Sequence, residues 1–202
     1  MSVRYHNFGG VIGWNLQKYF PMLSSDSYLK LQRSTRNKLQ KEYIDYFLST
    51  GEPPMPLVVN LETINRCNST CSFCTANKNA EKRPYKRMED SLFYSIIDQL
   101  AEWGYTGHLT LYGNNEPFLD TRIVEFHKYC REKLPHSFIF LSSNGLLLTV
   151  DKVKEIIPYV NQLIINNYCR DMKLHDNVRE IYEYAKSHPD EFKDVELLIQ
   201  MR

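Results

Sequence analysis

The 202-residue sequence carries almost no net charge, because 25 lysine and arginine residues are balanced by 24 aspartate and glutamate residues. A strongly basic surface, which would indicate a nucleic-acid or acidic-membrane partner, is therefore excluded as the basis of function. Long apolar runs are missing as well, since charged residues interrupt each one before it reaches the roughly 20 residues of a bilayer span. We expect neither a nucleic-acid partner nor a membrane partner.

The first ten residues, MSVRYHNFGG, lack the long apolar core of a secretory signal, which favours a cytoplasmic location. Disulfides are rare in that reducing compartment, and the five cysteines are an odd number that cannot all pair within one chain. Three of them, Cys67, Cys71 and Cys74, lie within eight residues of sequence. These cysteines need an explanation other than disulfide bonds.

The composition excludes a disordered chain, because 43% of the residues are hydrophobic and the sequence holds 10 Phe, 14 Tyr and 2 Trp. The length corresponds to about one domain.

Over residues 25–50, apolar residues recur at near-helical spacing with lysines and arginines between them, which predicts one amphipathic helix. The segment Gly-Glu-Pro-Pro at 51–54 ends it, because proline cannot continue a helix. We expect residues 1–56 to be an N-terminal helical extension, whose basic run is either a solvated face or a docking face for an acidic partner.

From residue 57 onward, short apolar runs alternate with helical stretches. The runs predict strands at residues 57–64, 108–112, 137–141, 162–165 and 195–200. The stretches predict helices around residues 92–100, 123–130, 153–160 and 178–185. This alternation implies an α/β fold with a parallel sheet, either doubly wound or curled into a barrel. In both architectures, ligands bind at the carboxyl ends of the strands.

Cys67, Cys71 and Cys74 form the pattern C-x-x-x-C-x-x-C directly after the first predicted strand. Three thiolates on one tight loop can wrap a metal ion or a cluster. A tetrahedral structural zinc site requires a fourth Cys or His nearby, and the nearest candidates, His108 and Cys130, belong to later elements. Three ligands without a fourth fit a [4Fe-4S] cluster with one iron left open for a small molecule.

This cysteine spacing, with the aromatic Phe73 just before the third cysteine, resembles the hallmark of the radical S-adenosylmethionine (radical SAM) superfamily. Residues 113–117, GNNEP, resemble the family's G-G-E-P stretch, and residues 142–145, SSNG, resemble its T-N-G stretch. The lead-in at residues 61–68, LETINRCN, is also similar. The resemblance implies a partial TIM-like (β/α) barrel over residues 57–202, with about five parallel strands where the family has six. We therefore expect the sequence to be truncated at the C-terminus.

The resemblance implies a role for each matched stretch. The three cysteines would hold a [4Fe-4S] cluster, residues 113–117 would hold the amino group of S-adenosylmethionine, and residues 142–145 would lie near its ribose. The residues that we expect to contact S-adenosylmethionine are Phe73, Gly113, Asn115, Glu116, Ser142, Asn144 and Asn166. The resemblance identifies no catalytic side chain.

The residue types of the GNNEP stretch suit this role. An ammonium group needs acceptors, which the Glu116 carboxylate and strand-end carbonyls supply, while Pro117 keeps Glu116 extended. Gly113 lets the backbone approach closely. Asn114 and Asn115 stand where glycine is usual in the family, and asparagine adopts left-handed conformations better than most residues.

Other polar and aromatic residues after the strands keep two interpretations. Ser142 and Asn144 can hydrogen-bond ribose hydroxyls, although Asn-Gly is also an ordinary turn dipeptide. Asn166 and Asn167, expected after the fourth strand, either contact ribose or form a turn. Phe73 either stacks near the adenine or packs the cysteine loop against the barrel.

Three remaining residues complete the set of candidates. Cys130 lies on the apolar face of its helix and is expected in the core. Cys169 follows the fourth predicted strand, so its position admits either a second functional role or a plain free cysteine. Arg202, at the end of the fifth strand, suits a carboxylate partner. The roles of Cys169 and Arg202 stay open.

The resemblance implies a radical SAM enzyme that reductively cleaves S-adenosylmethionine to a 5′-deoxyadenosyl radical, which abstracts hydrogen from a peptide or small-molecule substrate. Such an enzyme needs an external one-electron reductant, flavodoxin or ferredoxin. The N-terminal extension is similar to members with a C-terminal SPASM or Twitch region, which this sequence lacks. The alternatives are a glycyl-radical activating enzyme, an iron–sulfur electron-transfer protein and a silent regulatory homologue.

Overall fold

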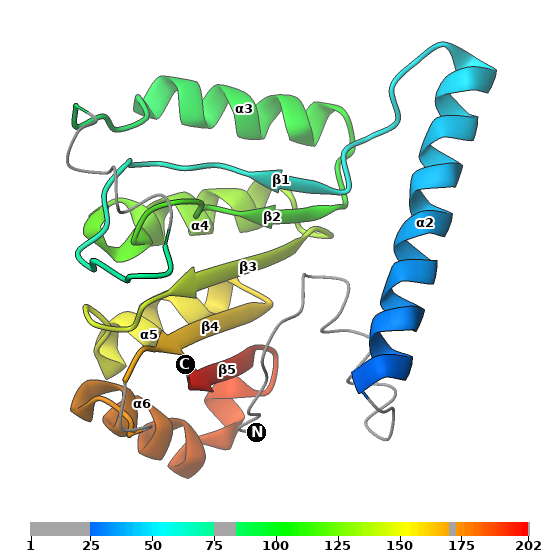
Figure 1. The fold of residues 1–202 in the computed structure, drawn as a ribbon. Coiled ribbons are helices and arrows are strands. Elements are labelled where there is room, and N and C mark those ends of the chain that lie inside the picture. The colour runs from blue at the N-terminus through cyan, green and yellow to red at the C-terminus, as the bar shows by residue number, and fades with distance from the viewer. Residues whose placement is uncertain (1–24, 75–83, 170–172, 202) are drawn as a thin grey trace. The chain divides into compact units, whose positions relative to one another are not determined.

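The computed structural model describes residues 25–74, 84–169 and 173–201 (Figure 1). Arg202 lies outside the described residues. The described chain forms two compact units, residues 25–56 and residues 57–201. No helix among the described residues is both long enough and apolar enough to cross a bilayer.

The first unit is built on helix α2, Ser25–Thr50, which confirms the helix predicted over residues 25–50. The helix ends where Gly51 adopts a left-handed φ of 75° and its N–H donates to the carbonyl of Phe47 at 2.8 Å. In the last turns of the helix, Lys41 pairs with Asp45 one turn onward, and both side chains are exposed. Such i,i+4 pairs are typical of a solvated helix face.

The second unit contains five parallel strands: β1 (Val58–Asn60), β2 (His108–Thr110), β3 (Phe138–Ser143), β4 (Gln162–Asn167) and β5 (Glu196–Met201). Their order in the sheet follows their order in the chain (Figure 1). A doubly wound sheet reverses its strand order at a switch point, whereas a barrel adds each strand beside the last. The α/β prediction is therefore confirmed, and the strand order selects the partial barrel over the doubly wound alternative.

Four α-helices follow the strands and cover one face of the sheet: α3 (Asp90–Glu102), α4 (Ile123–Lys133), α5 (Val150–Ile156) and α6 (Asp176–Ser187). Short 3₁₀ helices lie at Pro117–Leu119 (η2), Ile157–Tyr159 (η3) and Pro189–Phe192 (η4). Alternate strand residues, such as Leu109 and Ile139, are fully buried in one core with Phe93 and Phe126 of the helices. Cys130 is also fully buried there, as expected.

The strand ends differ from the prediction. The first strand stops at Asn60 instead of continuing to residue 64, and the third and fourth strands continue to Ser143 and Asn167. Asn166 and Asn167 therefore belong to β4 and do not follow it. The prediction followed apolar runs, so it stopped before these two polar residues. In the structure they pair in register with Gln200 and Met201 of β5.

Candidate functional site

One hollow at the carboxyl ends of β1–β4 gathers all ten residues that the sequence predicted for the cluster and for S-adenosylmethionine. It contains about 600 Å³ of empty space, open solvent included. The predicted residues that line it are Cys67, Phe73, Cys71, Cys74, Gly113, Asn115, Glu116, Ser142, Asn144 and Asn166. Five further residues also line it: Ser69, Tyr112, Asn114, Ser143 and Tyr168. Asn114 and Ser143 belong to the two matched stretches, whereas no role was predicted for Ser69, Tyr112 and Tyr168.

The loop that carries the three cysteines is closed at its base. Ile64 and Arg87 form an antiparallel bridge, and the backbone N–H of Asn65 donates to the carbonyl of Lys86 at 3.1 Å. The side-chain oxygen of Asn65 accepts the N–H of Lys86 at 2.9 Å. These contacts join two segments that lie about twenty residues apart in sequence, so the cysteines project from a fixed stem.

A buried arginine holds this stem from outside the loop. Arg122, only 9% exposed, binds both carboxylate oxygens of Asp120, with its Nη2 2.7 Å from Oδ2. The same guanidinium donates to Asp90 at the start of α3 and, at 2.9 Å, to the carbonyl of Met88. Met88 in turn donates its N–H to the carbonyl of Thr63 at 2.8 Å, which lies on the other side of the stem.

The three thiols are free and partly exposed. Partial burial raises the pKa of the Cys71 thiol, and the neighbouring thiols of Cys67 and Cys74 raise it further, because adjacent thiolates repel. Within the described residues, no three Cys, His, Asp or Glu side chains are grouped as ligands of a single metal ion. In a [4Fe-4S] cluster each thiolate binds a different iron. The thiols of a cluster site therefore lie farther apart than the ligands of a single metal ion.

Glu116 is 1% exposed, and both of its carboxylate oxygens are bonded within the protein. Oε1 accepts the Ser143 hydroxyl at 2.8 Å and the Phe118 N–H at 3.2 Å, and Oε2 accepts the Asn144 N–H at 2.8 Å. Burial raises the pKa of Glu116, and these three hydrogen bonds hold back part of the rise. The residue predicted as an ammonium acceptor therefore also joins the loops that follow β2 and β3.

Asn144 connects the loop after β3 to the cysteine loop. Its side-chain Nδ2 lies 2.7 Å from Asn68 Oδ1, 3.2 Å from Ser69 Oγ and 3.8 Å from Cys67 Sγ. Its Oδ1 accepts the N–H of Leu146 at 3.0 Å. The side chain predicted to face ribose thus contacts the residues around the first cysteine.

Gly113 and Asn115 form a tight turn at the rim of the hollow. The Gly113 N–H donates to Asn115 Oδ1 at 2.9 Å, while the buried Asn115 Nδ2 has no hydrogen-bond partner within the described residues. A Cβ at Gly113 would lie 2.9 Å from Glu62 Oε2, which accepts the Asn114 N–H at 2.8 Å. The close approach at Gly113 is therefore made by the carboxylate of Glu62, at the end of a flexible side chain. The sequence placed Glu62 only in the lead-in stretch and assigned it no role.

Ser142 and Asn166 face the hollow from adjacent strands. Asn166 Nδ2 donates to Ser142 Oγ at 2.8 Å. The neighbouring Asn167 is fully buried and points elsewhere, because its amide donates to the carbonyl of Lys173 and accepts the N–H of His175. Of the two asparagines, only Asn166 lines the hollow.

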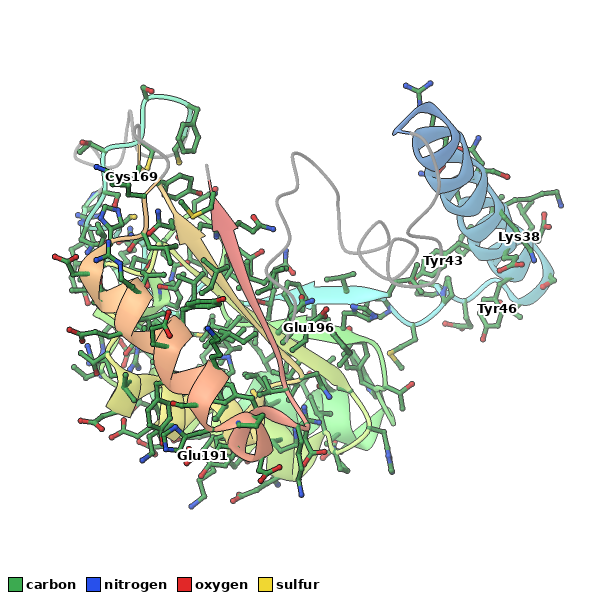
Figure 2. All side chains as sticks on the ribbon, turned by 90° about the horizontal axis from the view of Figure 1, so that it is seen from below. Lys38, Tyr43, Tyr46, Cys169, Glu191 and Glu196 are labelled. Carbon is green, nitrogen blue, oxygen red and sulfur yellow. The ribbon has the colours of Figure 1, made fainter. Side chains whose placement is uncertain are left out.

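Aromatic rings form another part of the lining. Phe73 is 62% exposed, and its ring centroid lies 5.1 Å from that of Tyr168, directly after β4. Tyr112, after β2, packs edge-on against Phe140. Cys169 follows Tyr168 at the tip of β4, beside the cyan cysteine loop (Figure 2). The position of both tyrosines next to strand ends is the signal that would have identified them.

The family model described as "Radical SAM superfamily" matches residues 61–193, which is more than half of the chain. The chain belongs to the radical SAM superfamily. A curated relative, the S-adenosyl-L-methionine-dependent 2-deoxy-scyllo-inosamine dehydrogenase of Niallia circulans, is 22% identical over 99 residues, or 49% of this chain and 39% of that protein.

Solved structures of radical SAM proteins share the fold. BtrN in complex with AdoMet and 2-DOIA matches with a TM-score of 0.59 and 18% identity, over 72% of this chain and 57% of that chain. SuiB of Streptococcus suis bound to S-adenosylmethionine matches with a TM-score of 0.57 and 16% identity, over 93% of this chain and 43% of that chain. The five parallel strands thus form a partial radical SAM barrel, and the chain spans less than two thirds of the length of these relatives.

The residues present fit the cofactors that the family implies, a [4Fe-4S] cluster and S-adenosylmethionine. Three neighbouring thiols supply the donor set for the cluster. The buried Nδ2 of Asn115, which has no partner in the described part of the chain, supplies a hydrogen-bond donor in the same hollow, which suits the carboxylate of an amino acid.

Proposed function

We propose that this chain is the barrel of a radical SAM enzyme that acts on a hydrogen atom of a peptide or small-molecule substrate. The observation that carries the proposal is the convergence of three cysteines and seven further predicted residues on one hollow at the carboxyl ends of parallel strands. In this assignment, residues 57–202 are the barrel domain and residues 1–56 are an N-terminal extension.

Cys67, Cys71 and Cys74 would hold the cluster. When bound, the cluster and S-adenosylmethionine supply reductive cleavage of the sulfonium and the radical that takes the substrate hydrogen. The protein's residues bind and orient these groups. Asn115 Nδ2 donates to the methionine carboxylate, and Glu116, which has carboxylate lone pairs beyond the three hydrogen bonds it accepts, takes a bond from the ammonium group.

The nucleoside end of the ligand has matching groups across the hollow. The hydrogen-bonded pair Ser142–Asn166 offers a hydroxyl and an amide to ribose hydroxyls. The tilted pair Phe73–Tyr168 offers apolar ring surface to the adenine.

The substrate and the electron donor are proposed at the level of class. An external one-electron reductant, flavodoxin or ferredoxin, delivers the electron. The relative from Niallia circulans is named a dehydrogenase of 2-deoxy-scyllo-inosamine, a small polar molecule. Together with the open hollow, this relative supports a small-molecule substrate, and a peptide stays the alternative.

Anaerobic reconstitution of the full chain with iron and sulfide tests the cluster. We expect about four iron atoms per chain in the wild type, a strong loss in Cys71→Ser, and unchanged iron content in the control Cys169→Ser. The electron paramagnetic resonance signal of the reduced protein should change on adding S-adenosylmethionine, and deoxyadenosine should form. Equal iron in Cys71→Ser and wild type, or a loaded chain that forms no deoxyadenosine, contradicts the proposal. A signal that S-adenosylmethionine leaves unchanged supports an electron-transfer protein instead.

A further inference from the structure

The orientation of the Asn144 side chain is determined by its surroundings. Asn144 is 8% exposed, and its backbone N–H is held by Glu116 Oε2. Its side-chain oxygen accepts the N–H of Leu146 at 3.0 Å, so the amide nitrogen must be the atom that faces the cysteine loop. A flipped amide would place two donors, the Leu146 N–H and the Asn144 NH₂ group, against each other.

The amide nitrogen has two hydrogens and three acceptors around it. The shortest contact, 2.7 Å to Asn68 Oδ1, takes one hydrogen. The other lies between Ser69 Oγ at 3.2 Å and Cys67 Sγ at 3.8 Å, which is within hydrogen-bond reach for sulfur. A thiolate that binds iron carries negative charge and is a stronger acceptor than a neutral hydroxyl. Binding of Cys67 to iron would therefore draw this hydrogen toward the sulfur.

We propose that Asn144 sets the reduction potential of the cluster by donating an N–H···S hydrogen bond to Cys67. This inference rests on the proposed function, because it requires Cys67 to be a cluster ligand. Reduction adds negative charge to the cluster and its sulfurs, and a donor to sulfur stabilises the reduced form. Asn144 acts through Cys67 as a positioning residue that tunes the cluster, and its contact with ribose stays a prediction.

Asn144→Ala and Asn68→Ala form a matched pair of variants. Both remove the 2.7 Å contact between the two asparagines, but only Asn144→Ala removes the donor to Cys67. The midpoint potential of the reconstituted cluster is measured by redox titration followed by electron paramagnetic resonance, without S-adenosylmethionine. We expect Asn144→Ala to lower the equilibrium constant for reduction about tenfold, equivalent to about 59 mV for one electron, and Asn68→Ala to keep the wild-type potential.

An unchanged potential in Asn144→Ala overturns the inference, and so does an equal fall in both variants, which would mean that only loop displacement matters. If Asn144→Ala binds no cluster, Ser69→Ala provides the test. It removes the competing acceptor, so the N–H should turn to Cys67 and raise the potential; an unchanged or lower potential contradicts the inference. Failure of the wild-type chain to bind a cluster refutes the proposed function, and is distinguishable from all of these results.

Discussion

Oε2 of Glu116 accepts the backbone N–H of Asn144 at 2.8 Å, which connects two loops that are 28 residues apart in sequence. The backbone N–H of Glu116 donates to the carbonyl of Arg66 at 2.8 Å, directly before the first cysteine. Glu116 thus joins the loops that follow β1, β2 and β3. The cysteines, the GNNEP stretch and the SSNG stretch lie on these three loops. One buried residue therefore links them, through its carboxylate to the SSNG stretch and through its backbone N–H to the cysteine loop.

Replacing Glu116 tests this connection. Glu116→Ala leaves the Ser143 hydroxyl and the Asn144 N–H without their acceptor, and each unpaired buried group costs about 1–3 kcal/mol. We expect the free energy of unfolding of the cluster-free chain, measured in urea, to fall by about 3 kcal/mol. Glu116→Gln keeps one carbonyl acceptor and should lose less. Wild-type stability in Glu116→Ala would show that the two loops hold their positions without this carboxylate.

Gly145 ends the SSNG stretch with a left-handed φ of 78°, and a Cβ there would lie 2.8 Å from Ile165 Cγ2 and 3.2 Å from Val178 Cγ2. Gly104 has a similar φ of 68° but open space around it. We expect Gly104→Ala to lose about 1 kcal/mol from backbone strain, and Gly145→Ala to lose about 1–3 kcal/mol more from overpacking. Thermal or urea unfolding measures both. Equal losses would mean that the core relaxes around the added methyl group.

Arg122→Met removes the charge that compensates the buried Asp120 carboxylate. Breaking a buried ion pair by removing one partner costs about 3–5 kcal/mol of the free energy of unfolding. We expect a loss near the lower value, because Asp90, the other carboxylate partner, is half exposed. Hydrogen exchange at the Met88 N–H should also accelerate, since the carbonyl of Met88 loses its donor. The exposed pair Arg179–Asp176 provides the control, and Arg179→Met should change stability little. Unchanged exchange at the Met88 N–H would show that Arg122 does not stabilise the stem of the cysteine loop.

His127 predicts a pH dependence. It is fully buried on α4, and burial lowers its pKa from 6.5 to about 4. The unfolded chain therefore binds a proton that the folded chain rejects between pH 6.5 and pH 4. Stability that is complete above pH 6.5 is lost as the pH falls to about 4, by up to about 3 kcal/mol for this group.

Unfolding of the wild type and of His127→Leu in urea, across pH 4 to 7, measures this contribution. The variant should show a flatter fall in stability toward low pH. Some slope will remain, because burial also lowers the pKa of His108, which acts in the same direction. Parallel curves for the two proteins would show that His127 does not titrate between the folded and unfolded states.

The strand-by-strand outcome shows what local pattern can predict. Apolar runs identified all five strands, because a strand buried in a parallel sheet needs apolar side chains along its length. The pattern failed at the ends, where Asn166 and Asn167 continue β4 with polar side chains. Their burial is possible because partners outside β4 satisfy them: Ser142 of β3 bonds Asn166, and Lys173 and His175, in the segment after β4, bond Asn167.

The sequence by itself determined that the three cysteines, the GNNEP stretch and the SSNG stretch meet at one end of the sheet. Parallel strands end at one edge of the sheet, so residues that follow separate strands converge there whatever their contacts are. Only the tertiary structure decided what those side chains do to one another. Glu116 and Asn144 bind partners 28 and up to 77 residues away in sequence, and the Asn144 side chain contacts Cys67. No local pattern specifies such bonds, because they depend on how three loops are brought together by the packing of the whole barrel.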